Sequence, residues 1–224
     1  MSDFILPQAS LFLGIIPALI LLYVSIKGYE GYYKDKTIFL TFIIGIVTGL
    51  IAAIVRIYSI PLAIIYIIII ALFEQLFKTI VLNLKRFQGK KETTIYGLSL
   101  GLGFGAVFTP FLLTSVAATT TISLQTFLFI VIGSFGFILF HSASGVYIGY
   151  GIYSSKLIKY LIIAIIIQLP FNTINDLTRL YFSNNYFPLL QISLLIYGVI
   201  FYIYVVKKIM PKILSRKRKK KVKF

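Results

Sequence analysis

The chain has no cysteine and a single histidine, His141. The lack of cysteine excludes structural disulfides, Cys-ligated zinc and thiol catalysis, and a single histidine excludes a His-rich metal site. Charged residues are also scarce, at 12% of the 224 residues against roughly 25% in a typical soluble domain. Hydrophobic residues make up 59%, and the mean hydropathy is +0.96. A water-soluble fold of this size could not bury so much apolar surface. The composition therefore predicts an all-α, polytopic protein of the cell membrane.

Seven apolar runs indicate seven transmembrane helices, most of them close to the ~20 residues that cross ~30 Å of hydrocarbon. The fifth run is too long for a perpendicular helix, so we expect it to be tilted, broken at its glycines or extended into water. Pro170 predicts a kink in the sixth run. The chain start lacks the cationic segment of a signal peptide, so we expect the first run to be retained. The predicted spans are residues 8–26, 38–55, 60–82, 95–117, 122–151, 157–180 and 187–206.

The distribution of basic residues predicts the orientation. The net charge of +16 comes from 22 Lys and Arg against 6 Asp and Glu. In a seven-helix arrangement Lys78 lies within a span, and Arg56 and Arg179 are the only basic residues on one side. Cytoplasmic loops carry the excess of Lys and Arg, so we expect the N-terminus outside and the C-terminus in the cytoplasm. The chain then divides into a seven-helix membrane domain, residues 1–210, and a basic cytoplasmic tail, residues 211–224.

The basic tail has two interpretations. Its cations, from Arg216 to Lys223, follow the last span directly. They could anchor the chain on anionic lipid headgroups, at about 1 kcal/mol per basic residue. They could instead dock to nucleic acid such as ribosomal RNA. The tail has no base-reading motif and no interleaved aromatic residues, which favours lipid headgroups as the partner.

Polar side chains within the apolar runs are the first candidates for a site, because a polar group in hydrocarbon must be paired or face a cavity. At ~1.5 Å per residue, Glu74 and His141 lie about 15 Å, and Gln168 about 17 Å, from the cytoplasmic face. Three polar groups at one depth predict a shared interior cluster. The candidates are Glu74, Gln75 and Lys78 in the third run, His141 in the fifth, and Gln168, Asn172, Asn175 and Asp176 in the sixth.

The charged candidates also have structural interpretations. Glu74 and Lys78 are four residues apart, on one helix face and in the order that favours an ion pair. The role of Lys78 could then be limited to this ion pair, with its amine reaching towards the membrane–water interface. A mid-membrane carboxylate needs more than one flexible partner, which favours a functional Glu74. His141 could belong to the site, or be a neutral imidazole bonded to a backbone carbonyl or a Ser hydroxyl.

Glycines recur every four residues in the fourth and fifth runs. Such ridges of small residues let two membrane helices approach closely. We interpret them as packing positions, which also allow side chains from different helices to converge. These glycines are Gly97, Gly101, Gly105, Gly145 and Gly149.

Over about residues 73–172, these motifs together resemble the PrsW family of intramembrane proteases. The family's Glu-Glu-x-x-Lys is similar to Glu74-Gln75-Leu76-Phe77-Lys78. Its Tyr-Gly…Gly-x-Gly-Phe run is similar to Tyr96-Gly97 and Gly101-Leu102-Gly103-Phe104. Its His followed by small residues is similar to His141-Ser142-Ala143-Ser144-Gly145. Its His-x-x-x-Asn is similar to Gln168-Leu169-Pro170-Phe171-Asn172. The order of the motifs in successive spans supports the resemblance.

Three key positions of the family pattern are replaced. Gln75 stands for the second Glu, Phe108 for a further Glu, and Gln168 for a His. A catalytic zinc usually has three protein ligands, so a divalent metal held by Glu74 and His141 would be under-ligated, and we assign no cofactor. A metal-free route would need Glu74 as the base, with His141 orienting water or the developing oxyanion.

The resemblance and its replacements imply a degenerate, non-catalytic member that binds a membrane-embedded protein partner or lipid. One alternative is a residual intramembrane peptidase, with Glu74 and His141 as catalytic residues. Another is a small transporter with a proton-sensitive Glu74–His141 pair, although polar groups are few and no inverted repeat is evident. In the peptidase the supporting residues would be Gln75, Lys78, Gln168 and Asn172.

Overall fold

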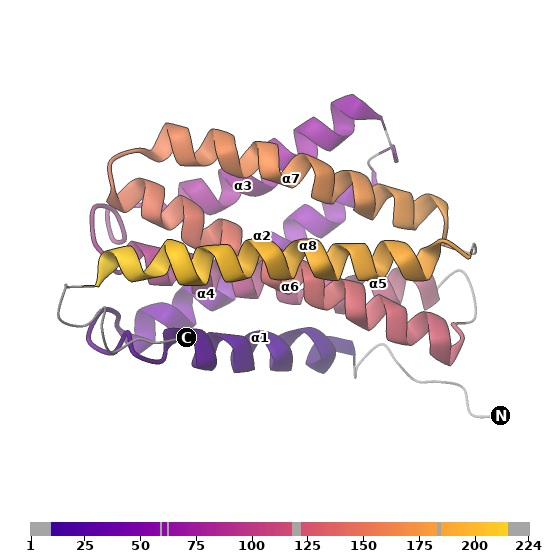
Figure 1. Ribbon diagram of the computed structural model, residues 1–224, viewed down its shortest axis with the longest axis horizontal. Coiled ribbons are helices and arrows are strands. Elements are labelled where there is room, and N and C mark those ends of the chain that lie inside the picture. Colours follow the sequence, from indigo (N-terminus) through magenta and orange to yellow (C-terminus); the bar gives the residue numbers. More distant parts are fainter. Residues whose placement is uncertain (1–9, 59, 62, 118–121, 183–184, 215–224) are drawn as a thin grey trace.

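The computed structural model describes residues 10–58, 60–61, 63–117, 122–182 and 185–214, and these residues form a bundle of helices without a β-strand (Figure 1). The prediction of an all-α chain is confirmed. The α-helices are α1 (Ser10–Ile26), α2 (Asp35–Ile57), α3 (Ile64–Leu82), α4 (Thr93–Ala106), α5 (Phe108–Ala117), α6 (Leu124–Tyr153), α7 (Leu157–Leu180) and α8 (Phe187–Lys208), followed by the 3₁₀-helix η1 (Met210–Ile213).

Six stretches of the described chain are long and apolar enough to cross a membrane, which is the pattern of a multi-pass membrane protein. Large apolar side chains cover the outside of the bundle, as Ile158, Ile162 and Ile166 do on α7. The helix α1 is apolar but shorter, with 17 residues. The six stretches are Asp35–Arg56, Ile64–Leu82, Glu92–Phe111, Leu124–Tyr153, Leu157–Leu180 and Phe187–Ile213.

The fourth predicted span, residues 95–117, is wrong as a single helix, because it divides into α4 and α5 at Val107. Pro110 lacks the N–H that would bond to the carbonyl of Ala106, so the regular hydrogen-bond ladder is interrupted there. The helix resumes with the bond from Phe111 N to Val107 O at 3.1 Å.

The long fifth span is a single helix of 30 residues, α6, so the expected alternative of a break at its glycines is wrong. These glycines instead receive neighbouring helices, and that packing offsets their low helix propensity. The helix α7 continues through Pro170, so this proline does not end the helix, and the predicted kink stays a prediction. Two predicted spans begin later in the structure, since α3 begins at Ile64 instead of residue 60 and α6 begins at Leu124 instead of residue 122. The described part of the first run begins at Ser10. The start of that run at residue 8 lies outside the described residues.

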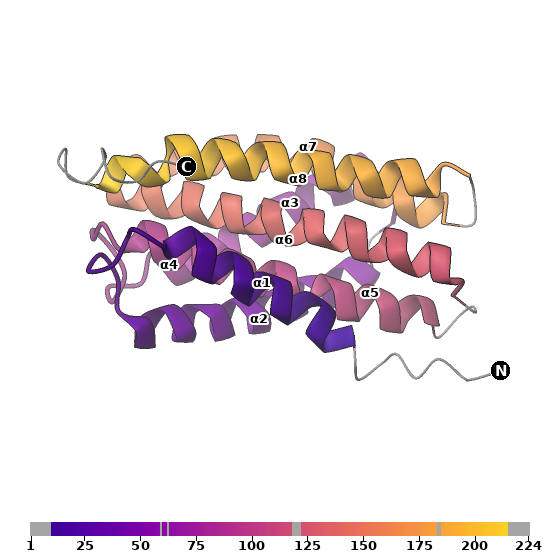
Figure 2. The same ribbon diagram turned by 60° about the horizontal axis from the view of Figure 1, so that its bottom comes forward.

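The helix α4 lies at the centre of the bundle, and all fourteen of its residues are buried. It lies between α6 on one side and α1 and α2 on the other, with α7 and α8 beyond α6 (Figure 2). A Cβ atom at Gly97 would overlap the carbonyl oxygen of Gly145, and one at Gly101 would overlap that of His141. The two glycine ridges therefore bring the backbones of α4 and α6 into direct contact and fix His141 against α4.

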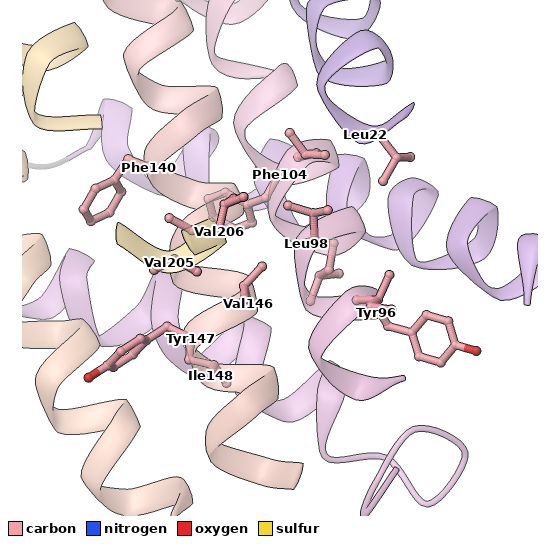
Figure 3. Close-up of a cluster of buried hydrophobic side chains, with 14 of the residues drawn as sticks. Leu22, Tyr96, Leu98, Phe104, Phe140, Val146, Tyr147, Ile148, Val205 and Val206 are labelled. Carbon is pink, nitrogen blue, oxygen red and sulfur yellow. The ribbon is translucent and has the colours of Figure 1, made fainter. Parts of the chain in front are cut away.

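The apolar core surrounds this contact. Figure 3 shows Leu98 and Phe104 of α4 beside Val146 of α6, with Val205 and Val206 of α8 reaching the same cluster. The close packing of α4, α6 and α8 makes a fixed wall against which α3 and α7 present their polar side chains.

Candidate functional site: a buried charge network

The helix α3 turns a face with both polar and apolar side chains towards the bundle and an apolar face outwards. Its middle buries Glu74, Gln75 and Lys78, while Leu76 and Ile80 are exposed on the other side. Residues three and four apart share one side of a helix, so the three polar side chains are directed inwards together. We call the buried polar side chains gathered there the charge network: Arg56, Glu74, Gln75, Lys78, His141, Ser144, Gln168, Asn172 and Asp176.

Arg56 from the last turn of α2 holds the carboxylate of Glu74. Its Nη2 donates hydrogen bonds of 2.9 Å both to Glu74 Oε1 and to Asn172 Oδ1 of α7. Asn172 in turn donates to the carbonyl of Ile67 at 3.4 Å. Glu74 is fully buried and Arg56 is 7% exposed. One guanidinium thus ties α2, α3 and α7 together through a buried ion pair.

The two glutamines continue the network between α3 and α7. The Nε2 atom of Gln75 donates to Gln168 Oε1, and the Nε2 atom of Gln168 donates to Glu74 Oε2. Both carboxylate oxygens of Glu74 therefore accept a hydrogen bond, one from a guanidinium and one from an amide. A glutamine at position 168 can make this donation at any pH, because its amide always carries the proton.

Lys78 connects α3 to α6. Its Nζ lies 2.9 Å from His141 Nδ1 and donates to Ser144 Oγ at 2.7 Å and to Gln75 Oε1 at 3.5 Å. When Lys78 carries its charge it is a donor only, so Nδ1 of His141 accepts and the ring proton belongs to Nε2. The Nε2 atom lies 3.9 Å from Glu74 Oε2. It has no hydrogen-bond partner among the described residues.

Aromatic rings enclose the imidazole. Phe108 stacks on His141 at 12° with 5.5 Å between the ring centres, and Phe104 lies 4.7 Å away on another side. Lys78 Nζ is 4.7 Å from the centre of the Phe104 ring, a cation–π distance. Phe137 and Phe171 also lie near His141. These rings keep the network in an apolar surrounding, where each charge interaction is stronger than in water.

At its more exposed end the charge network contacts α7 again. Asp176 Oδ1 lies 3.8 Å from Arg56 Nη1 and 3.9 Å from Arg179 Nη1. Arg179 also donates to the carbonyl of Arg56 at 3.4 Å, and its side chain is 29% exposed. Charges therefore alternate in sign from the partly exposed Arg179, through Asp176 and Arg56, to the buried Glu74.

The structure brings seven of the eight polar candidates into this one network, and the eighth, Asn175, is buried on α7 but is not a member. The seven are Glu74, Gln75, Lys78, His141, Gln168, Asn172 and Asp176. The sequence reasoning missed Arg56, which it treated only as a connecting residue at the end of a span. One signal in the sequence could have indicated Arg56. It shares with Asp176 and Arg179 a position near the end of an apolar run, on the side of the membrane that otherwise has few charges. Ser144 was also missed, and its position three residues after His141 places it on the same face of α6.

The donor set of the network is poor for a metal ion. The described residues contain no group of three or more His, Cys, Asp or Glu side chains that could hold one. Glu74 and His141 are the two candidate ligands, and the guanidinium of Arg56 is already bonded to that carboxylate. A surface cavity of about 200 Å³ lies elsewhere, at the start of α6, lined by Gln125 and Phe129 and by Phe182 and Asn185 of the α7–α8 connection.

Comparison with protein-family models, with curated proteins and with solved structures found no match to this chain.

Proposed function

We propose that this chain is a non-catalytic, multi-pass protein of the cell membrane, on a PrsW-like scaffold, that binds a membrane-embedded partner, either a protein helix or a lipid. The observation that carries the proposal is that both oxygens of Glu74 are occupied, one by Arg56 and the other by Gln168. A general base must accept a proton from its substrate or from water, so a carboxylate held by a guanidinium is poorly suited to that role.

The surroundings of His141 support the same proposal. Phe108 stands where the resemblance to the family expects a carboxylate, and its ring stacks on the imidazole. The amine of Lys78 lies within hydrogen-bond distance of the Nδ1 atom of His141. The histidine is thus left with one N–H, on the nitrogen that lies 3.9 Å from Glu74 Oε2. This supports a role for the ring in holding charges of the protein, instead of activating a water molecule for peptide hydrolysis.

The proposal includes seven spans, with α1 as the first, an outside N-terminus and a cytoplasmic C-terminus. Its support is the distribution of charge over the two ends of the bundle. The end where α3, α6 and α8 finish is rich in cations, and the end where α2 and α7 finish has the paired Arg56, Asp176 and Arg179. The described cations at the first end are Lys27, Lys34, Lys36, Lys85, Arg86, Lys90, Lys91, Lys156, Lys159, Lys207, Lys208 and Lys212.

Anionic lipid headgroups are the partner that we propose for this cationic end. Clusters of Lys and Arg on the cytoplasmic side attract anionic lipids by about 1 kcal/mol per residue. The basic tail, residues 211–224, would extend the same surface, but from residue 215 onwards it lies outside the described residues. Ribosomal RNA is the alternative partner, and vesicles of neutral and of anionic lipid distinguish the two.

A cleavage experiment tests the absence of catalysis. Purified protein in liposomes is incubated with a panel of tagged single-span proteins, and products are followed by blotting, with photo-crosslinking in parallel. We expect the wild type and Glu74→Ala to release no product while both form crosslinks to a subset of the panel. A product that appears with wild type and disappears with Glu74→Ala would establish the residual peptidase instead. The absence of any crosslink, to lipid or to protein, would overturn the binding role.

A further inference from the structure

We propose that Lys78, His141 and Glu74 form an internal proton relay, in which the two nitrogens of one imidazole connect an ammonium to a carboxylate. The relay is independent of the partner that the protein binds. It starts from the geometry of the ring: Nδ1 lies 2.9 Å from Lys78 Nζ, and Nε2 lies 3.9 Å from Glu74 Oε2. An imidazole can accept a proton on one nitrogen while it releases one from the other.

The two ends of the relay have different surroundings. Lys78 is 1% exposed, and its three hydrogen-bond partners, His141, Ser144 and Gln75, carry no charge when the imidazole is neutral. The charged guanidinium of Arg56 lies 2.9 Å from the carboxylate of Glu74. A buried charge is costly without an opposite charge beside it. Lys78 is therefore the member of the network with the strongest reason to lose its proton, and Arg56 is the group that keeps Glu74 from taking it.

The transfer itself is balanced and needs no other reactant. A proton passes from Lys78 Nζ to His141 Nδ1, so that one N–H bond breaks and another forms. The proton on His141 Nε2 passes to Glu74 Oε2, where an O–H bond forms. The charged state, with ammonium and carboxylate, becomes a neutral state with amine and carboxylic acid. The imidazole stays neutral and changes from the Nε2–H to the Nδ1–H tautomer.

The remaining neighbours of the relay leave Lys78 and Glu74 as its two ends. From α2, Arg56 is the charged group that faces Glu74, and from α7 the facing groups are Gln168 and Asn172, which do not titrate. On α6, Ser144 accepts from Lys78 and donates to the carbonyl of His141 at 3.0 Å. The second nitrogen of His141 has no other hydrogen-bond partner in the described part of the chain, so the gap to Glu74 is open to be closed by about 1 Å or bridged by one water.

Arg56 sets the balance between the two states. While its guanidinium holds Glu74, the charged state is favoured. Arg56 also faces Asp176, and Asp176 faces the partly exposed Arg179. Loss of the contact between Arg56 and Glu74 would favour the neutral state and move a proton from Lys78 to Glu74, deep in the bundle.

The single histidine makes the test direct, because ¹⁵N-histidine labelling reports on His141 alone. The tautomer is read by solid-state NMR in liposomes, and the carboxylic-acid band by infrared spectroscopy. We expect the wild type to be mainly Nε2–H without the band. Arg56→Gln should shift at least half of the molecules to Nδ1–H and produce a band that is absent from Arg56→Gln/Glu74→Gln. Arg179→Gln, which leaves the contact of Arg56 with Glu74 intact, is the matched control and should behave as the wild type.

Two outcomes would overturn the relay. In the first, Arg56→Gln keeps the Nε2–H tautomer and shows no acid band, so no proton has moved. In the second, the band appears without a change of tautomer, which means that Glu74 took its proton from solvent. If Arg56→Gln does not fold, Arg56→Lys is measured in its place. The point charge of this lysine cannot bond Glu74 and Asn172 as the guanidinium does, so we expect a smaller shift in the same direction.

Discussion

The guanidinium of Arg56 and the carboxylate of Glu74 are 2.9 Å apart, although the two residues belong to different helices and each helix turns an apolar face outwards. The pair joins α2 to α3, which touch each other over a small area. Its contribution to the stability of the bundle can be measured, because removal of one member leaves the other charge buried.

Arg56→Gln and Glu74→Gln should each lower the free energy of unfolding by roughly 3–5 kcal/mol, the cost of leaving an uncompensated buried charge. The double variant should lose less than the sum of the two, since it leaves neither charge alone. Unfolding by SDS in mixed micelles gives the values. Arg179→Gln, whose side chain is 29% exposed, is the control and should cost much less. Additive losses would contradict a coupled pair.

Lys78→Met should be neutral or should stabilise the protein, by up to about 1–4 kcal/mol, in contrast to the change at Glu74. Among the described residues no carboxylate lies within 4.0 Å of Lys78, so methionine removes a buried charge that has no ion pair while nearly keeping the volume. The same SDS titration measures the effect. A loss of several kcal/mol would mean that the ammonium is needed to hold His141 and Ser144 in place.

Gly101→Ala should destabilise the contact between α4 and α6 by about 1–3 kcal/mol, the usual cost of overpacking. The new Cβ would overlap the carbonyl oxygen of His141, which belongs to the backbone and cannot rotate away. Thermal unfolding in detergent, followed by circular dichroism, measures the loss. Ser193→Ala on the exposed side of α8 serves as the control. A stability equal to that of the control would show that α4 and α6 are farther apart than described.

The orientation can be read from single-cysteine variants, because the chain has no cysteine of its own. A maleimide that cannot cross membranes should label Gln125→Cys and Tyr186→Cys in intact cells. Lys90→Cys and Lys156→Cys should be labelled only after the cells are opened. All four positions are exposed. The reverse pattern would place the cationic end outside and overturn the proposed orientation.

The sequence predicted much of the fold, because apolar runs of about twenty residues leave a membrane helix few alternatives. The boundaries of α7 were predicted at Leu157 and Leu180, where charged and polar residues interrupt the run. The break at Val107 was missed. Pro170 lies within the continuous helix α7, whereas Pro110 follows a break and lies in the first turn of α5. Proline alone does not distinguish the two outcomes. Neighbouring helices decide whether the lost hydrogen bond can be tolerated.

Within the candidate site, the depth argument predicted that Glu74, His141 and Gln168 would meet. Depth is fixed by helix rise, and α3, α6 and α7 are nearly regular. The pairing pattern could not be predicted, because it depends on how each helix is rotated about its axis. One interpretation of the sequence paired Glu74 with Lys78, whereas the ion pair is with Arg56 and Lys78 lies against His141. The catalytic and supporting roles assigned to these residues stay predictions.

The full burial of α4 also has a consequence for how the protein is made. Among the six membrane-length stretches, the one that contains α4 has the lowest hydropathy, and its glycines give it little apolar surface of its own. The translocon releases a segment into lipid according to the apolarity of that segment. We expect α4 to be a poor substrate for release alone, so that it waits beside the channel until α6 has been synthesised and the two can leave as a pair.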